Sequence, residues 1–230
     1  MNWVNANIGG RHYNVIITIY NSCVVTGVTM ILNHLWGIYT HPKEEWQTID
    51  KRHESYFYAL SHIMLIALIP AGMAYYASAY LGWDIGAGGT ADTIKLTQES
   101  AMLMAIAMYF GLIIGVVVLA VIINELAKSF DSFPTYTQSL ELAAYTATPL
   151  FMAGFSAFYP ELWFIMCMGL VGLSYSVYLL YSGVPIMLHI PEEKGFIYSS
   201  SVVTCGLVLL VILMASSVIL WSVGVGPQYM

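Results

Sequence analysis

Five long apolar stretches constrain this chain more than any other feature of its sequence. They cover residues 58–81, 101–123, 140–158, 162–188 and 202–225. The hydrocarbon core of a bilayer is about 30 Å thick, so a helix that rises about 1.5 Å per residue crosses it in about 20 residues. A lone β-segment would leave its backbone groups unsatisfied in lipid, which favours helices. The sequence therefore predicts an all-α polytopic membrane helix bundle with five transmembrane helices.

The composition agrees with a membrane protein and excludes several other classes. Of the 230 residues, 59% are apolar and only 9% are charged, whereas a soluble domain carries about 25% charged residues. The formal net charge of −6 excludes a nucleic-acid partner, because phosphate binding needs a basic surface. The three cysteines form no CxxC pair, so neither a zinc ribbon nor a disulfide framework is indicated.

The positions of lysine and arginine predict the orientation of the helices. With five spans, six of the seven basic residues fall on one side: Arg11, Lys43, Lys51, Arg52, Lys128 and Lys194. Only Lys95 falls on the other side. Basic loops stay in the cytoplasm, so we expect the N-terminus in the cytoplasm and the short C-terminal tail outside.

The part of the chain before residue 58 divides into two segments. Residues 1–29 are expected to be a poorly structured extension, with Met30 as an alternative start. The moderately apolar residues 13–32 leave open a sixth span, whereas a signal peptide is disfavoured by the lack of a small-residue cleavage site. Residues 30–57 are expected to hold cytoplasmic interfacial helices, and residues 58–230 form the five-span domain.

Two amphipathic helices are predicted in this cytoplasmic segment. Apolar residues repeat at helical spacing from Val28 to Tyr39, a pattern typical of a helix that lies in the membrane interface. A second short helix is expected from Pro42 to Glu54, because proline suits the first helical position and Glu44 and Glu45 suit the first turn.

The histidines do not indicate a metal site. Four of them lie between residues 34 and 62, with two glutamates nearby: His34, His41, His53, His62, Glu45 and Glu54. None has the close spacing of a confident zinc motif, and no cofactor motif occurs. His62, about one turn into the first span, is expected to be solvated at the interface.

Hydroxyl groups and prolines suggest a polar seam between the third and fourth spans. A proline inside a helix frees a carbonyl that must find another partner in lipid, and an ionisable group at the membrane is a functional candidate. The seam residues are Glu141, Tyr145, Pro149, Tyr178, Tyr181, Ser182 and Pro185. The seam either binds a ligand or holds the bundle together, and the sequence leaves both open.

Gly111 and Gly115 in the second span form a small-xxx-small pattern, which lets helices approach closely. The pattern predicts packing within the chain or a homo-oligomer. Membrane lipids and a membrane-protein partner are the other expected partners.

Three short segments resemble the bacterial branch of the YIP family, named for eukaryotic proteins that interact with Rab-type (Ypt) GTPases. They are residues 36–46 (WGIYTHPKEEW), 144–149 (AYTATP) and 178–185 (YLLYSGVP). The resemblance extends from Met30 to the C-terminus. It implies a multi-pass protein of the bacterial inner membrane and supplies no catalytic residue.

Two functions from different classes follow from these patterns. The first is a non-catalytic membrane scaffold or organiser that binds protein or lipid partners. The second is a small-solute or ion transporter or channel that uses the polar seam, with Glu141 as a proton or cation site. The absence of a visible inverted repeat weighs against the second function, and no set of catalytic side chains supports an enzyme.

Overall fold

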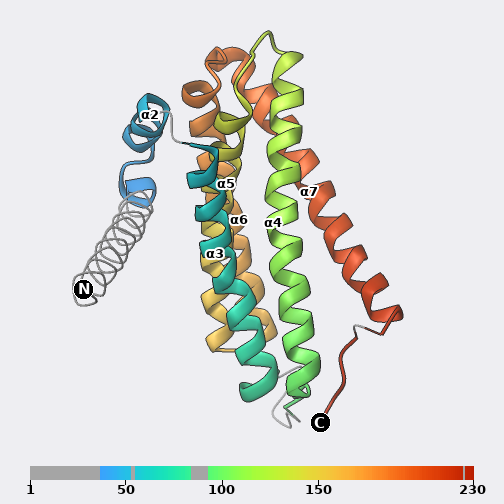
Figure 1. The fold of residues 1–230 in the computed structure, drawn as a ribbon. Coiled ribbons are helices and arrows are strands. Elements are labelled where there is room, and N and C mark those ends of the chain that lie inside the picture. The colour runs from blue at the N-terminus through green and yellow to red at the C-terminus, as the bar shows by residue number, and fades with distance from the viewer. Residues whose placement is uncertain (1–36, 53–54, 84–92, 225) are drawn as a thin grey trace, which may run out of the picture. The chain divides into compact units, whose positions relative to one another are not determined.

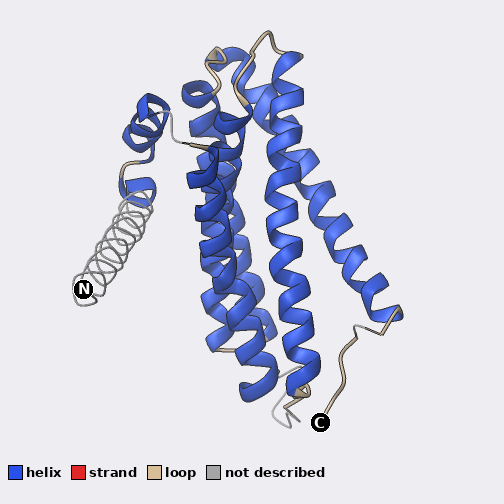
Figure 2. Cartoon of the chain, viewed as in Figure 1, coloured by secondary structure: helices blue, strands red, loops and turns tan. Residues whose placement is uncertain are grey.

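The fold is known from a computed structural model, which describes residues 37–52, 55–83, 93–224 and 226–230. The chain divides into two compact units, Met1–Glu45 and Trp46–Met230. The described residues form helices and connecting loops, with two isolated β-bridges and no strand (Figure 2). The expected all-α fold is confirmed.

Most of the predicted N-terminal features fall outside the described residues. These are the extension over residues 1–29, its alternative as a sixth span, and most of the first interfacial helix. Residues 37–40 are helical, and α2 runs from Pro42 to Arg52, close to the range expected for the second short helix. The location of these helices at a membrane interface stays a prediction.

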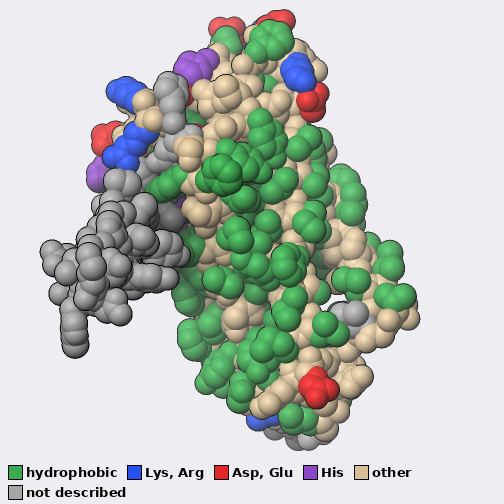
Figure 3. Space-filling view, in the orientation of Figure 1, with side chains coloured by type: hydrophobic (Ala, Val, Ile, Leu, Met, Phe, Trp, Pro, Cys, Tyr) green, Lys and Arg blue, Asp and Glu red, His purple; other side chains and the backbone are tan. Residues whose placement is uncertain are grey.

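Four helices are long and apolar enough to cross a membrane, and they correspond to four of the five apolar stretches (Figure 1). They are α3 (Tyr56–Tyr76) continued by η1 (Ala77–Leu81), α4 (Gln98–Lys128), α6 (Leu162–Met187) and α7 (Glu192–Ser222). Large apolar side chains on these helices remain exposed, and they cover most of the face seen in Figure 3. Such a surface is suited to lipid hydrocarbon.

The remaining stretch forms α5 (Tyr136–Met152), which continues as the 3-10 helix η2 (Ala153–Phe158). Eleven of the 17 residues of α5 are buried, because α3, α4 and α6 all pack against it. A helix enclosed by other helices need not present an apolar surface to lipid, and polar groups in membrane helices face the bundle interior. This enclosure explains why the third stretch is shorter and more polar than the others.

Small residues allow neighbouring helices to approach the α5–η2 segment closely. A Cβ atom at Gly154 in η2 would lie 2.7 Å from the Cα of Pro70 in α3. On α6, a Cβ atom at Gly172 would lie 3.0 Å from the carbonyl oxygen of Pro149. The central segment is therefore in near backbone contact with two of its neighbours.

Side-chain caps define where two of the helices begin. Thr135 accepts a hydrogen bond from the backbone N–H of Gln138, whose side chain accepts from the Thr135 backbone in return. This capping box satisfies two of the N–H groups that a helix start leaves without partners. Thr97 caps α4 in a similar way through the backbone N–H of Ser100.

We predict that Gly154→Ala destabilises the bundle by about 1–3 kcal/mol, the typical cost of overpacking a core. The added methyl group would meet the backbone of Pro70, which has no flexible side-chain end that could move aside. The measurement is the free energy of unfolding in lipid bicelles, by denaturant titration followed with circular dichroism.

Gly169→Ala in α6 is the matched control, since nothing lies within 4 Å of its Cβ position. We expect this change to be neutral or to stabilise the helix by up to about 1 kcal/mol. Equal effects of the two substitutions would contradict the close contact of η2 with α3.

Candidate functional site

The centre of the bundle holds polar side chains from one face of α5. Glu141, Tyr145 and Thr148 follow at intervals of four and three residues, so they share this face. All three are buried, with Glu141 and Tyr145 only 1% exposed. An ionisable group at such a depth is a functional candidate.

His62 of α3 joins this polar face from the neighbouring helix. Its Nε2 atom lies 3.0 Å from the Thr148 hydroxyl oxygen, and that hydroxyl donates its proton to the Ala144 carbonyl at 2.9 Å. The Thr148 hydroxyl therefore links His62 to the backbone of α5. His62 is 1% exposed, so the expectation that it is solvated at the interface is wrong: α5 covers it.

Aromatic rings extend the polar face to α2 and α6. The His62 and Tyr145 rings lie with centroids 4.7 Å apart, and Trp46 of α2 meets Tyr145 edge-on at 6.1 Å. The indole N–H of Trp46 donates to the Ser182 hydroxyl of α6 at 3.2 Å. These contacts join α2, α3, α5 and α6. The residues that make them, together with Glu141 on the same face of α5, are called the central cluster: Trp46, His62, Glu141, Tyr145, Thr148 and Ser182.

The structure brings together only part of the predicted seam. Glu141, Tyr145 and Ser182 belong to the central cluster, and Pro149 is buried one residue beyond Thr148. Tyr181 turns to α7, where its hydroxyl lies 2.7 Å from the hydroxyl of Ser200.

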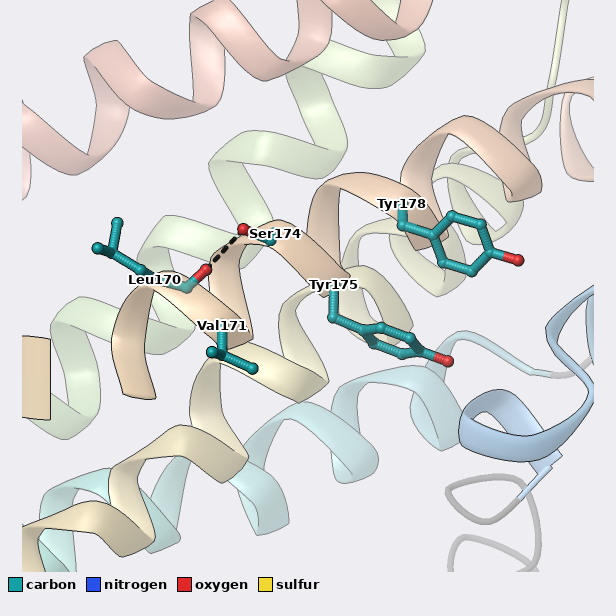
Figure 4. Close-up of a pocket in the computed structure, with 5 residues that line it drawn as sticks. All are labelled: Leu170, Val171, Ser174, Tyr175 and Tyr178. Atoms are coloured by element: carbon teal, nitrogen blue, oxygen red, sulfur yellow. Dashed lines mark hydrogen bonds between the residues drawn. The ribbon is translucent and has the colours of Figure 1, made fainter. Parts of the chain in front are cut away.

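The two remaining seam residues lie away from the central cluster. Pro185 also faces α7, since its ring lies 3.5 Å from the Cβ position of Gly195. Tyr178 is 49% exposed and projects with Tyr175 from one side of α6 (Figure 4). The two tyrosines line a shallow, largely apolar groove of about 440 Å³, so they do not contribute to a continuous seam with α5.

Exposed ion pairs lie at the end of α4 and between the following loop and the start of α7. Lys128 pairs with Glu125 at 2.6 Å, and Lys194 pairs with Asp131 at 3.3 Å. Exposed pairs of this kind contribute little to stability. Within the described ranges no three His, Cys, Asp or Glu side chains gather closely enough to hold a metal ion; His34, His53 and Glu54 lie outside these ranges.

Sequence reasoning missed the parts that His62, Thr148 and Trp46 play. His62 lies four and eight residues before Ile66 and Pro70, both buried, so it shares a helix face with them. The sequence does not show that this face is the buried one, because the opposite face of α3 is apolar as well. Trp46 lies in a separate helix, and only the tertiary fold brings it to Tyr145.

Two chemical roles suit the central cluster. A buried carboxyl group on the same helix face as Tyr145, whose ring contacts His62, is able to hold a proton or a small cation within the membrane. The same side chains also fasten α2, α3, α5 and α6 to one another, which is a structural role.

Comparison with known proteins identifies relatives of this chain. Residues 36–213 match the family model described as the Yip1 domain. The inner membrane protein YohC of Escherichia coli strain K12 is 34% identical over 194 residues, which cover 84% of this chain and 98% of YohC. YohC of strain O6:H1 matches to the same extent. No solved structure matches the chain.

We predict that Thr148→Val destabilises the bundle by about 1 kcal/mol. The variant keeps the shape of the side chain but removes the hydroxyl that lies 3.0 Å from the Nε2 atom of His62 in the core. The free energy of unfolding in bicelles measures the loss.

Thr204→Val serves as the control, because the Thr204 hydroxyl is exposed and donates only to the Ser200 carbonyl of its own helix. We expect no measurable change there. An equally small effect at Thr148 would show that the contact with His62 contributes nothing to stability.

Proposed function

The chain belongs to the Yip1 domain family, and from this premise we propose that it is a non-catalytic organiser of the bacterial inner membrane that binds lipid or protein partners. Its relative YohC is named an inner membrane protein. The four long apolar helices make this chain an integral membrane protein as well.

The proposed topology has five spans, with the N-terminus in the cytoplasm. Enclosure by three neighbouring helices allows α5 to cross the membrane although it is short and polar, and η2 adds six helical residues to its 17. With five crossings, the described basic residues other than Lys95 share one side with the N-terminus, in keeping with the positive-inside rule.

The observation that carries the organiser role is the packing of the central cluster. Its polar groups contact one another across four helices, and its members on α5 are almost fully buried. Polar side chains used in this way fasten a bundle. Because the cluster is packed, partners bind to the surfaces of the outer helices instead.

A second candidate function is the transport of a small solute or ion, and the burial of Glu141 is the observation that favours it. Glu141 lies one helical turn from Tyr145, whose ring centroid lies 4.7 Å from that of His62. Chains of carboxyl and imidazole groups form proton relays in pumps and transporters. On this hypothesis Glu141 is the proton or cation site.

A flux measurement in proteoliposomes separates the two functions. We expect the wild-type protein to leave the permeability to H⁺, Na⁺ and K⁺ equal to that of protein-free vesicles, because the central cluster is packed. Native mass spectrometry of the protein released from nanodiscs should show a retained lipid or protein partner. Glu141→Gln should change neither result while circular dichroism shows a folded helix bundle.

Glu125→Gln is the matched control, since the Glu125 carboxylate is exposed and pairs with Lys128. Flux above the vesicle background that Glu141→Gln removes and Glu125→Gln preserves would overturn the organiser role. It would establish the transport function in its place.

A further inference from the structure

Helices α4 and α7 run side by side for only part of their length. Tyr198 of α7 donates its hydroxyl proton to the Ile123 carbonyl of α4 at 2.6 Å. Further along, a Cβ atom at Gly115 would lie only 2.9 Å from a methyl carbon of Leu213. The two helices diverge toward the C-terminal end of α7 (Figure 1).

The C-terminal tail ties the separated ends together again. After α7 the chain returns to the start of α4, where the Ser100 hydroxyl donates to the Gly226 carbonyl at 2.9 Å. The backbone N–H of Thr97 donates to the Gln228 carbonyl at 2.8 Å. The space between the helices is therefore bounded by the tail at one end, and Leu213 reaches across it to Gly115.

This space is a crevice of about 750 Å³, within the range of known ligand pockets. Its walls come from α4, α7, α5 and the α3–η1 segment, and its lining is almost wholly apolar. Met104 and Gly111 of α4, Leu213 and Ser217 of α7, Phe151 of α5 and Ser78 of η1 are among the lining residues. Nothing lies within 4 Å of a Cβ atom placed on Gly111, so this glycine faces open space inside the crevice.

The crevice extends over more than half of α4. Its lining on this helix runs from Ala101 to Leu119, about 27 Å at about 1.5 Å per residue, and α4 has 31 residues. Half of the hydrocarbon core is about 15 Å thick, so the crevice is deep enough to hold an acyl chain of one leaflet along its full length.

The dimensions and chemistry of the crevice indicate whether water, a helix of a second copy or a lipid acyl chain fits it best. Water does not fill an apolar space of this kind. A spanning helix of a second copy is about 30 Å long and about 10 Å across with its side chains, so it needs several times the 750 Å³ of the crevice. An acyl chain of the adjacent leaflet is thin and flexible, fits within this space, and enters sideways from the bilayer.

Polar groups gather at the tail end of the crevice. There the indole N–H of Trp83 donates to the Ser78 hydroxyl at 3.0 Å, and both residues line the crevice. The Lys95 ammonium group donates to the Tyr80 carbonyl at 2.8 Å, one residue before Leu96, another lining residue. An amphiphile would therefore place its headgroup at this end and its chain along Gly111.

We propose that the crevice between α4 and α7 is a binding site for one acyl chain of a membrane phospholipid. The site deepens the organiser role and rests on it, since it names lipid as the partner. The lipid fills the gap where the two helices diverge, and its headgroup lies beside Ser78 and Trp83. Gly111 is the position that admits the chain.

Photolabelling tests the site directly. The full chain is reconstituted in nanodiscs of phosphatidylethanolamine and phosphatidylglycerol that contain a phospholipid with a diazirine in its acyl chain. After irradiation, mass spectrometry of peptides maps the labelled residues. We expect the label to concentrate on the crevice walls around Met104 and Leu213.

Gly111→Leu fills the crevice, and we expect it to lower this labelling about tenfold, because the new side chain displaces several methylene groups of the lipid. Gly169→Leu is the matched control on α6: it too replaces a helical glycine with open space around its Cβ, but outside the crevice. The control should label the crevice like the wild type. Circular dichroism of each variant checks that the bundle is folded.

Two outcomes would overturn the site. In one, the label spreads evenly over the lipid-facing residues of α6 and α7 in the wild type. In the other, the crevice stays unlabelled while native mass spectrometry shows a dimer that Gly111→Leu disrupts, the outcome expected if Gly111 and Gly115 bind a second copy. Neither outcome predicts ion flux above the vesicle background, which is the result that would overturn the organiser role. A failure of the lipid site is therefore distinguishable from a failure of the organiser role.

Discussion

The enclosure of α5 by α3, α4 and α6 is the constraint on which the rest of the bundle depends. A helix in lipid must present apolar side chains around its circumference, whereas a helix in the centre of a bundle meets only protein. Glu141, Tyr145 and Thr148 can therefore occupy one face of α5 without exposure to hydrocarbon. The same enclosure requires small residues where helices cross, and Gly154 and Gly172 lie at two of these crossings.

The central cluster follows from this arrangement, because polar groups removed from both water and lipid need partners within the protein. His62 contacts the Thr148 hydroxyl, and the Trp46 indole N–H donates to the Ser182 hydroxyl. Through Trp46 the cluster also fastens the C-terminal part of α2 to the bundle. In our proposal, these paired polar groups make the cluster a structural core. The burial of Glu141 also meets the first requirement of a proton site.

Helix α7 is placed differently, since it packs on α4 and α6 and has no extensive contact with the central helix. Its surface is mostly apolar and exposed, and its contact with α4 ends where the two helices diverge. Close packing fills the interior around α5, while the space between α4 and α7 is left to the bilayer. The bundle therefore combines a packed polar centre with an apolar crevice at its edge, and the proposed lipid site lies in the crevice.

The sequence by itself determined the helical class and the position of each long helix, because backbone groups must be satisfied in lipid and about 20 apolar residues are needed for a crossing. It also singled out Glu141, Tyr145 and Ser182, whose polar groups contrast with their apolar surroundings. Only the tertiary structure decided that α5 is central, that His62 is buried, and that Tyr178 and Tyr181 turn away from α5. The reason is physical: lipid is as apolar as a leucine-rich helix surface, so the sequences of α3 and α6 show no amphipathic pattern that distinguishes the face that meets protein from the face that meets the membrane.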